Sequence, residues 1–264
     1  MLFGVGAVAS AMAAVFAVGD TRVGANVVAS PDDAWQLVSA RNSPTVTRNP
    51  TRPSEVVVVD RVDRPGFSAE VNWSGDGGRT WRHRSLPLPV GRDRPYAPDA
   101  VFARDGTLFF SYLNLEGTGN DPQTLWLAKS GDGGATLSAP VEVADGLVFQ
   151  PRLAVGADRT VYLTWLQGSE VGDLSLLGAP APVVEVRSTD GGATFSAPVR
   201  VSDASRRLVG APSAVVGSDG SLFVLYEDFN GDVRDFENLD GPVWDSPFAL
   251  VPTTGTGGRR DWVL

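Results

Sequence analysis

The chain repeats one short pattern three times, as Ser74-Gly75-Asp76-Gly77-Gly78-Arg79-Thr80-Trp81, Ser130-Gly131-Asp132-Gly133-Gly134-Ala135-Thr136-Leu137 and Ser188-Thr189-Asp190-Gly191-Gly192-Ala193-Thr194-Phe195. We name these segments box 1, box 2 and box 3. Their aspartates, at positions 76, 132 and 190, lie 56 and 58 residues apart. A near-constant period of this kind indicates one supersecondary unit that is copied and stacked.

Each box has the chemistry of a tight turn. Its Asp and Ser side chains can accept hydrogen bonds from nearby backbone N–H groups, and its glycine pair permits positive φ. The apolar residue that closes each box is expected to fold inward as a plug. We therefore predict a structural role for the box residues rather than a catalytic one: Ser74, Asp76, Gly78, Trp81, Ser130, Asp132, Gly134, Ser188, Asp190, Gly192 and Phe195.

A second repeat precedes each box and consists of a Pro-led apolar segment, a polar turn and another apolar segment. Its four copies begin at Pro44, Pro98, Pro151 and Pro212. Runs of Val, Phe, Tyr and Trp between Gly/Asp turns predict strands joined in hairpins. Adding one strand before each box and one after it gives four antiparallel strands per period, which is the blade of a β-propeller. The predicted fold class is all-β, with blades at about 44–90, 98–145, 150–202 and 210–264, the last incomplete.

The boxes resemble the Asp-box, or BNR, repeats of the sialidase superfamily, and the likeness covers roughly residues 44 to 226. The resemblance implies a six-bladed propeller, of which this chain holds about four blades, with the boxes on the face opposite to the active site. Where a fourth box is due, Thr256 stands in place of the Asp. We expect a fragment of a longer propeller, with a closed four-bladed ring or assembly with another chain as the alternatives.

The first 19 residues carry no charged side chain and are rich in Ala, Val and Gly. This length predicts the apolar region of a signal peptide or a membrane anchor, and hence an extracellular or cell-surface location. The basic residues that usually precede such a region are missing, so one interpretation is that the native start lies upstream. Residues 20–43 form an N-terminal segment that is a candidate outer strand.

Composition removes several classes of function. The formal net charge of −9 disfavours nucleic acid as a partner. With no cysteine and one histidine, disulfides, thiolate chemistry and Cys-based zinc sites are excluded. The alternation of Asp228, Asn230 and Asp232 starts like a calcium loop, but Val233 stands where that loop needs glycine. We expect neither a metal nor a cofactor.

Ligands of propellers bind at the mouth, where loops that lead into the innermost strands converge. The most unusual segment there holds Arg92, Arg94, Tyr96 and Asp99, and Arg206 precedes the fourth blade. Guanidinium groups make paired hydrogen bonds to carboxylates, so this set is a candidate site for a glycan or an extracellular protein. The alternative, which we weigh more heavily, is that Arg and Asp pair with each other while Tyr96 packs between blades.

The resemblance also implies a competing hypothesis, an exo-sialidase-type glycoside hydrolase. Arg48 loosely matches the family's early Arg-x-Pro motif, Asp63 lies where an acid/base loop is due, and Arg152 is a candidate second clamp arginine. The family's last arginine and nucleophilic tyrosine belong to later blades. Because fold resemblance does not carry activity, we predict a recognition scaffold and keep hydrolysis as the alternative.

Overall fold

The computed structural model describes residues 41–62, 66–169, 181–204, 209–228, 249–253 and 262–263. These ranges hold strands and turns, and no helix occurs in them. Accordingly, the described residues include no helix long and apolar enough to cross a membrane. The predicted leader at 1–19, the segment before residue 41 and the altered fourth box lie outside the described residues.

Antiparallel strands form three sheets. The first sheet has the order β1 (Arg41–Arg48), β2 (Val56–Val62), β3 (Ser68–Ser74) and β4 (Arg82–Ser85). The central sheet runs β5 (Pro95–Phe102), β6 (Leu108–Glu116), β7 (Asp121–Ser130), β8 (Val141–Val155), β9 (Val161–Gln167), β10 (Val183–Ser188) and β11 (Val199–Arg200). The third sheet holds β12 (Val209–Val216), β13 (Leu222–Asp228), β14 (Ala249–Thr253) and β15 (Trp262–Val263).

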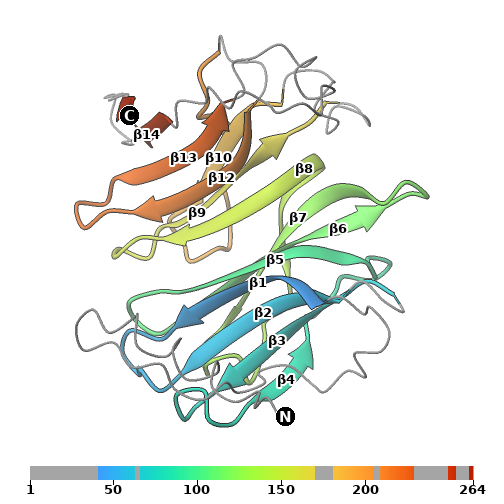
Figure 1. Ribbon diagram of the computed structural model, residues 1–264, viewed down its shortest axis with the longest axis vertical. Helices are drawn as coiled ribbons and strands as arrows, with labels where there is room; N and C mark the ends of the chain where they lie inside the picture. The colour runs from blue at the N-terminus through green and yellow to red at the C-terminus, as the bar shows by residue number, and fades with distance from the viewer. Residues whose placement is uncertain are drawn as a thin grey trace, which may run out of the picture.

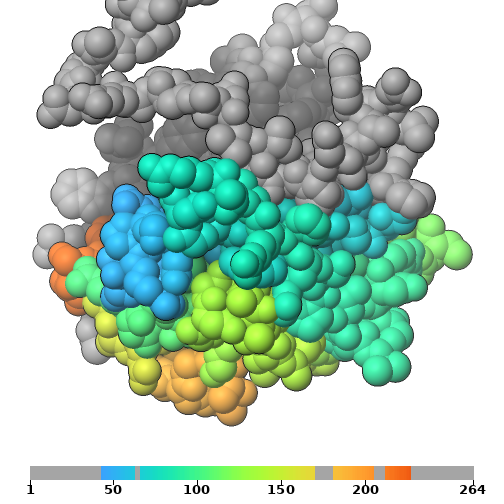
Figure 2. Space-filling model, turned by 90° about the horizontal axis from the view of Figure 1, so that it is seen from below, coloured from blue at the N-terminus to red at the C-terminus, as the bar shows by residue number. Residues whose placement is uncertain are grey.

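These sheets follow the repeat of the sequence. We name β1–β4 blade 1, β5 to the first half of β8 blade 2, the second half of β8 to β11 blade 3, and β12–β15 blade 4. The blades follow one another along the long axis of the molecule, from β1–β4 at the bottom of Figure 1 to β12 and β13 near the top. Seen from below, blue atoms of blade 1, green and lime atoms of blade 2 and orange atoms of blade 3 lie side by side (Figure 2).

One strand departs from the expected pattern. The repeat predicts one strand after box 2 and a separate strand from Pro151 onward, but β8 is continuous over 15 residues. Its first half pairs with β7 as far as Leu147, and its second half pairs with β9 from Val148 onward. Gly146, at φ 104°, supplies the left-handed residue that lets the strand change partner without ending. Blades 2 and 3 therefore share a strand.

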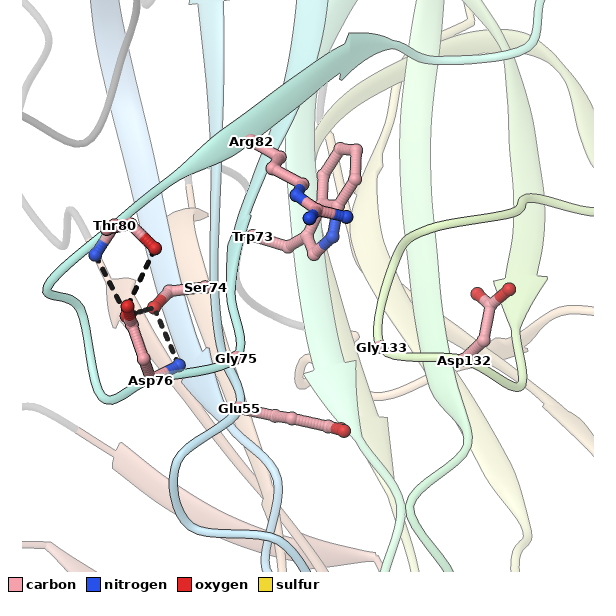
Figure 3. A pocket seen from close by; sticks show the side chains of 9 residues that line it. All are labelled: Glu55, Trp73, Ser74, Gly75, Asp76, Thr80, Arg82, Asp132 and Gly133. Carbon is pink, nitrogen blue, oxygen red and sulfur yellow. Dashed lines mark hydrogen bonds between the residues drawn. The ribbon is translucent and has the colours of Figure 1, made fainter.

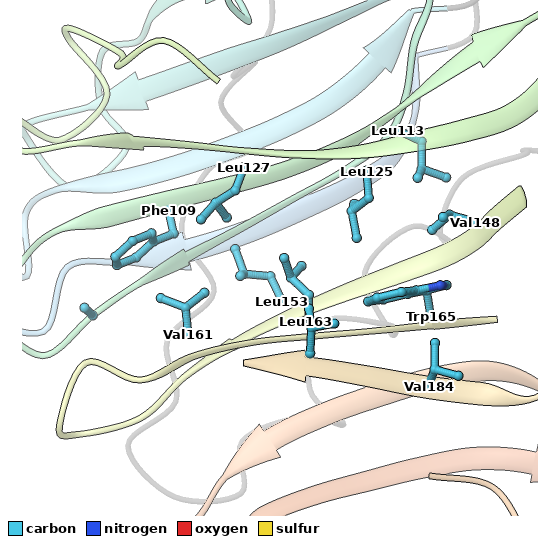
Figure 4. Packing of buried hydrophobic residues seen from close by; sticks show 12 residues of the cluster. Phe109, Leu113, Leu125, Leu127, Val148, Leu153, Val161, Leu163, Trp165 and Val184 are labelled. Carbon is cyan, nitrogen blue, oxygen red and sulfur yellow. The ribbon is translucent and has the colours of Figure 1, made fainter. Parts of the chain in front are cut away.

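Apolar clusters fill the spaces between successive blades. Between blades 2 and 3, side chains of β6 and β7 face those of β8, β9 and β10 (Figure 4). Trp165 lies in this cluster and is completely buried. Strand β6 is buried along nearly its whole length because both of its faces meet a neighbouring blade, which explains its near-continuous apolar sequence. Similar clusters join blade 1 to blade 2 and blade 3 to blade 4.

The three boxes are turns between the third and fourth strands of blades 1, 2 and 3, and they share one hydrogen-bond pattern. In box 2, the Ser130 hydroxyl donates to the Asp132 carboxylate at 2.8 Å and accepts the Gly134 N–H at 2.9 Å. Thr136 donates both its N–H and its hydroxyl to Asp132, each at 2.7 Å. The equivalent bonds occur in boxes 1 and 3. Each box carboxylate is thus an acceptor for its own turn.

The residues that close the boxes differ in their packing. Leu137 packs against the cluster between blades 1 and 2, and Phe195 against that between blades 2 and 3. Trp81 is half-buried and donates its indole N–H to the Gly78 carbonyl at 3.0 Å. Inward packing of the plug is therefore clearest for boxes 2 and 3.

Replacing Asp132 with alanine is expected to lower the free energy of unfolding by about 1 kcal/mol, because three donors in the turn lose an acceptor that is largely exposed to solvent. Burial alone would raise the pKa of Asp132, but the bonds from Thr136 and Ser130 lower it. The contribution of Asp132 is therefore present above the ordinary aspartate pKa and disappears as the pH falls below it. Urea denaturation at two pH values measures this loss. Asp93→Ala, an exposed carboxylate outside the boxes, is the control, and equal stability of the two variants would contradict the structural role.

Candidate functional site

A bulge recurs in the innermost strand of every blade. The pairing register shifts between Asn42 and Thr45 in β1, Tyr96 and Asp99 in β5, Phe149 and Arg152 in β8, and Gly210 and Ser213 in β12. Each shift brackets an X-Pro dipeptide of the Pro-led repeat. Because proline has no N–H to give to the ladder, a bulge is one of the few places where a strand accommodates it.

The residue before three of these prolines is left-handed although it is not glycine. Its φ is 52° at Ser43, 46° at Ala97 and 52° at Gln150. Such conformations are unfavourable, and they collect at sites where a fold aims side chains at a ligand. Bulges are likewise frequent beside active sites because they redirect the residue that follows.

The redirected residues meet in one cavity, which we name the inner-strand pocket. It has a volume of about 570 Å³ and lies between β1, β5, β8 and β12. The residue after each repeat proline lines it: Thr45, Asp99, Arg152 and Ser213. The pocket lining follows β1 from Ser43 to Thr47 and includes no box residue. Box 1 lies beyond the end of β1, where Arg48 pairs with Val56, which in turn pairs with the first residue of that box.

Asp99 is buried within this site and fastens two blades together. One carboxylate oxygen accepts the Ala100 N–H and the other accepts the Leu153 N–H of β8, both at 2.9 Å. Burial raises the pKa of Asp99, while the two backbone bonds, the charge of Arg152 and a bond from Thr45 offset part of that rise. Its carboxyl group thus holds β5 and β8 in a fixed relation at the pocket wall.

Arg152 supplies the exposed cation of the pocket. Its guanidinium donates to the carbonyl of Pro151 at 3.4 Å, which is near the limit for a hydrogen bond. It follows directly on the bulge that Asp99 anchors through Leu153. A guanidinium held in this way can donate to hydroxyl or carboxylate oxygens of a ligand.

Tyr96 adds an aromatic wall. It is half-buried in the pocket lining, and the Arg61 guanidinium lies 4.0 Å from its ring centroid. A cation over the ring face fixes the orientation of the phenol. Tyr96 also packs against the apolar cluster between blades 2 and 3. Tyr96 therefore packs between blades, as one interpretation predicted, and lines the pocket as well.

The other arginines predicted for the mouth have partners at the end of β6 and on the turn that follows it. Arg92 forms an ion pair with Glu116, and Arg94 donates to the Gly117 carbonyl at 3.0 Å and to Asn120 at 2.7 Å. Neither residue lines the inner-strand pocket. Within the predicted set, the structure therefore brings together Tyr96, Asp99 and Arg152, and places Arg92 and Arg94 outside.

Arg48 is the last residue of β1 and does not line the pocket, although its neighbour Thr47 does. It pairs with Val56 in the strand register and donates to the Pro53 carbonyl at 2.7 Å. The structure does not bring it together with Arg152. Asp63 and Arg206, the remaining predicted site residues, lie outside the described residues.

Thr45 and Ser213 are pocket residues that the sequence alone did not indicate as candidates. Both follow a proline of the repeat, as Asp99 and Arg152 do, and this shared position is the signal that finds them. A metal site is not evident: within the described ranges, no three His, Cys, Asp or Glu side chains come together in a way that could hold an ion.

Comparison with known proteins bears on the fold. No protein-family model matches the chain, and no curated protein matches it. Several solved structures match the chain. The α-L-arabinanase of Penicillium chrysogenum, complexed with arabinobiose, is 16% identical with a TM-score of 0.64, over 86% of this chain and 67% of that one. The GH93 α-L-arabinofuranosidase of Fusarium graminearum, also with arabinobiose, is 14% identical with a TM-score of 0.59, over 83% and 65%.

A third similar structure is the Hadza microbial sialidase Hz136, at 18% identity and a TM-score of 0.59, over 84% of this chain and 46% of that one. The chain thus spans less than half the length of this sialidase and about two thirds of the other two enzymes. At this level of identity the likeness concerns the fold, and it confirms the predicted all-β propeller class.

Proposed function

We propose that this chain is a glycan-recognition β-propeller that binds a saccharide in the inner-strand pocket. The observation that carries the proposal is the convergence of Tyr96, Asp99 and Arg152 on one cavity through a bulge repeated in every blade. An aromatic wall, a few fixed polar groups and a concave shape are the usual features of a small-molecule site. The apolar first 19 residues support export to the extracellular space as part of the same proposal.

The chemistry of the pocket favours binding over hydrolysis. Glycosidases generally use two carboxyl groups that flank the scissile bond, and those of sialidase type use an acidic side chain together with a tyrosine nucleophile. Among the described residues that line the pocket, Asp99 is the one carboxyl group, and both of its oxygens accept backbone N–H groups. The pocket also has the volume of a ligand site of modest size, since such sites commonly enclose about 300–1,000 Å³.

Arg152→Gln is expected to weaken saccharide binding at least tenfold while leaving the melting temperature nearly unchanged, because the Arg152 side chain is exposed. The measurement is a glycan array followed by calorimetric titration of the strongest hit, with Tyr96→Ala as the second pocket variant. Arg104→Gln is the control, since Arg104 is an exposed arginine on the turn after β5 and outside the pocket.

Two results would overturn the proposal. One is a glycan hit whose affinity is the same in Arg152→Gln, Tyr96→Ala and the unchanged protein. The other is turnover of a fluorogenic sialoside that Arg152→Gln abolishes, which would establish the hydrolase alternative. If the protein binds an extracellular protein and no glycan, the proposed ligand changes from a saccharide to a protein.

A further inference from the structure

A second cavity lies at the other end of the blades, between box 1 and box 2, and we name it the box pocket. Its volume is about 330 Å³. Figure 3 shows its walls: Asp76 and Thr80 of box 1 on one side, Gly133 and Asp132 of box 2 on the other, and Trp73 with Arg82 between them. No residue is shared between this lining and that of the inner-strand pocket.

The box pocket lies where the repeat differs at one position, the residue immediately before the box. Trp73 stands immediately before box 1, and the equivalent residue before box 2 is Lys129. Lys129 reaches across to box 3 and donates to the Gly191 carbonyl at 3.0 Å, so the second gap between boxes is bridged. In the first gap Trp73 makes no such bond to the Gly133 carbonyl, and the space beside the indole forms the box pocket.

The walls offer acceptors, a donor and an aromatic surface. The carboxylates of Asp76 and Asp132 serve their own turns, and Glu55 pairs with Arg52 at 2.9 Å and accepts from Asn49 at 2.7 Å. Asp76 accepts four hydrogen bonds and has its acceptor positions filled, whereas Asp132 accepts three and Glu55 has two partners, which leaves positions for a ligand on the latter two. The exposed guanidinium of Arg82 has no hydrogen bond or ion pair to any described residue.

This charge pattern selects a class of ligand. Three carboxylates line the pocket, so an anion is repelled. The Arg82 guanidinium in the lining offsets part of this negative charge, and the Arg84 guanidinium lies over the Trp73 ring, 5.5 Å from its centroid, where a ligand cation would otherwise bind. A neutral molecule with many hydroxyl groups can donate to the Glu55 and Asp132 carboxylates, accept from Arg82 and place an apolar face beside the indole.

We infer that the box pocket is a second binding site, on the face opposite to the inner-strand pocket, that takes a residue of a neutral oligosaccharide. The site does not depend on the function proposed for the inner-strand pocket, because it is built from other residues at the other end of the sheets. Where both pockets hold sugar, two sites on one scaffold raise the affinity for a polysaccharide through effective concentration.

A matched pair of variants tests this inference. A Cβ added at Gly75, in the pocket lining, meets no atom within 4 Å, so Gly75→Phe can enter the pocket without disturbing the turn. Gly131 is the same position of box 2, is equally open and lies outside the lining, so Gly131→Phe is the control. Thr189 at this position of box 3 shows that the turn accepts a side chain there.

The experiment titrates arabinohexaose, xylohexaose and cellohexaose by calorimetry into protein that carries Arg152→Gln, in which binding at the inner-strand pocket is expected to be at least tenfold weaker. We expect at least one sugar to bind, its affinity to fall tenfold or more with Gly75→Phe, and no change with Gly131→Phe. Arg82→Gln, on an exposed strand position, is expected to weaken the same sugar and provides a second variant that leaves the turn intact.

Three outcomes would overturn the inference: no binding of any of the sugars, equal loss with Gly75→Phe and Gly131→Phe at unchanged melting temperatures, or binding that Arg152→Gln alone abolishes. The last outcome would place the sugar in the inner-strand pocket and support the function proposed there, so the two proposals fail separately.

Discussion

Trp165→Ala is expected to lower the free energy of unfolding by about 3–5 kcal/mol, the range for removing a fully buried tryptophan from a core. Trp165 has no exposed surface and lies in the cluster between blades 2 and 3. Its indole N–H donates to the Gln167 side chain at 2.9 Å. The substitution therefore leaves a cavity and removes a buried hydrogen bond, and because blades 2 and 3 meet through this cluster, both are weakened.

Chemical denaturation monitored by circular dichroism measures the effect of Trp165→Ala. Trp165→Phe, which keeps most of the volume and loses the hydrogen bond, is expected to fall between the alanine variant and the unchanged protein. The control is Trp81→Ala at a half-buried tryptophan in box 1. A loss below about 1 kcal/mol for Trp165→Ala would show that the cluster does not hold the blades together.

Asp99→Ala is the second change with a large expected effect, a loss of about 3 kcal/mol in the free energy of unfolding. The N–H groups of Ala100 and Leu153 would both lose their acceptor in a buried position, and each unsatisfied buried donor costs about 1–3 kcal/mol. Saccharide binding is expected to fall with stability, because the backbone next to Arg152 loses its anchor on β5.

The pH dependence distinguishes Asp99 from the box carboxylates. Burial raises the pKa of Asp99, so between the ordinary aspartate pKa of about 4 and the raised value, the folded protein holds a proton that the unfolded chain has lost. The contribution of Asp99 to stability is therefore fully present below that window and decreases as the pH rises through it. Hydrogen bonds lower the pKa of the box aspartates, whose contribution is instead lost as the pH falls.

Asp99→Asn is the matched variant, because it keeps an acceptor oxygen and cannot titrate. Its stability is expected to lie above that of Asp99→Ala and to decrease less between pH 4 and pH 7 than that of the unchanged protein. Identical pH profiles for Asp99→Asn and the unchanged protein would contradict the buried, titrating carboxyl group.

The sequence predicts the fold well where local chemistry determines structure. A Ser-x-Asp-Gly-Gly box specifies its own turn, since donor and acceptor lie within five residues, and the spacing of the boxes then implies the blade. The continuous strand β8 was not predicted because Ala144, Asp145 and Gly146 look like a turn. Whether such a segment turns or stays extended depends on β7 and β9, which are distant in the sequence.

The candidate site was predicted only in part, because it too depends on contacts between residues that are distant in the sequence. Tyr96, Asp99 and Arg152 carry chemistry that is visible in a sequence, whereas Thr45 and Ser213 are small polar residues that become site residues through a bulge. Arg92 and Arg94 lie just before β5, but their partners at the end of β6 and on the following turn come from about 25 residues further along the chain. Arg48 matches a sequence motif, but its exclusion from the pocket lining depends on how the strands assemble.

Strand β8 belongs to both blade 2 and blade 3. Repeat proteins often unfold one unit at a time, since each repeat contacts only its neighbours through an interface that can separate. Here one continuous strand passes from pairing with β7 to pairing with β9, so blades 2 and 3 are joined by paired backbone rather than by a loop. We therefore expect blades 2 and 3 to unfold together, and the propeller to open first between blades 1 and 2 or between blades 3 and 4.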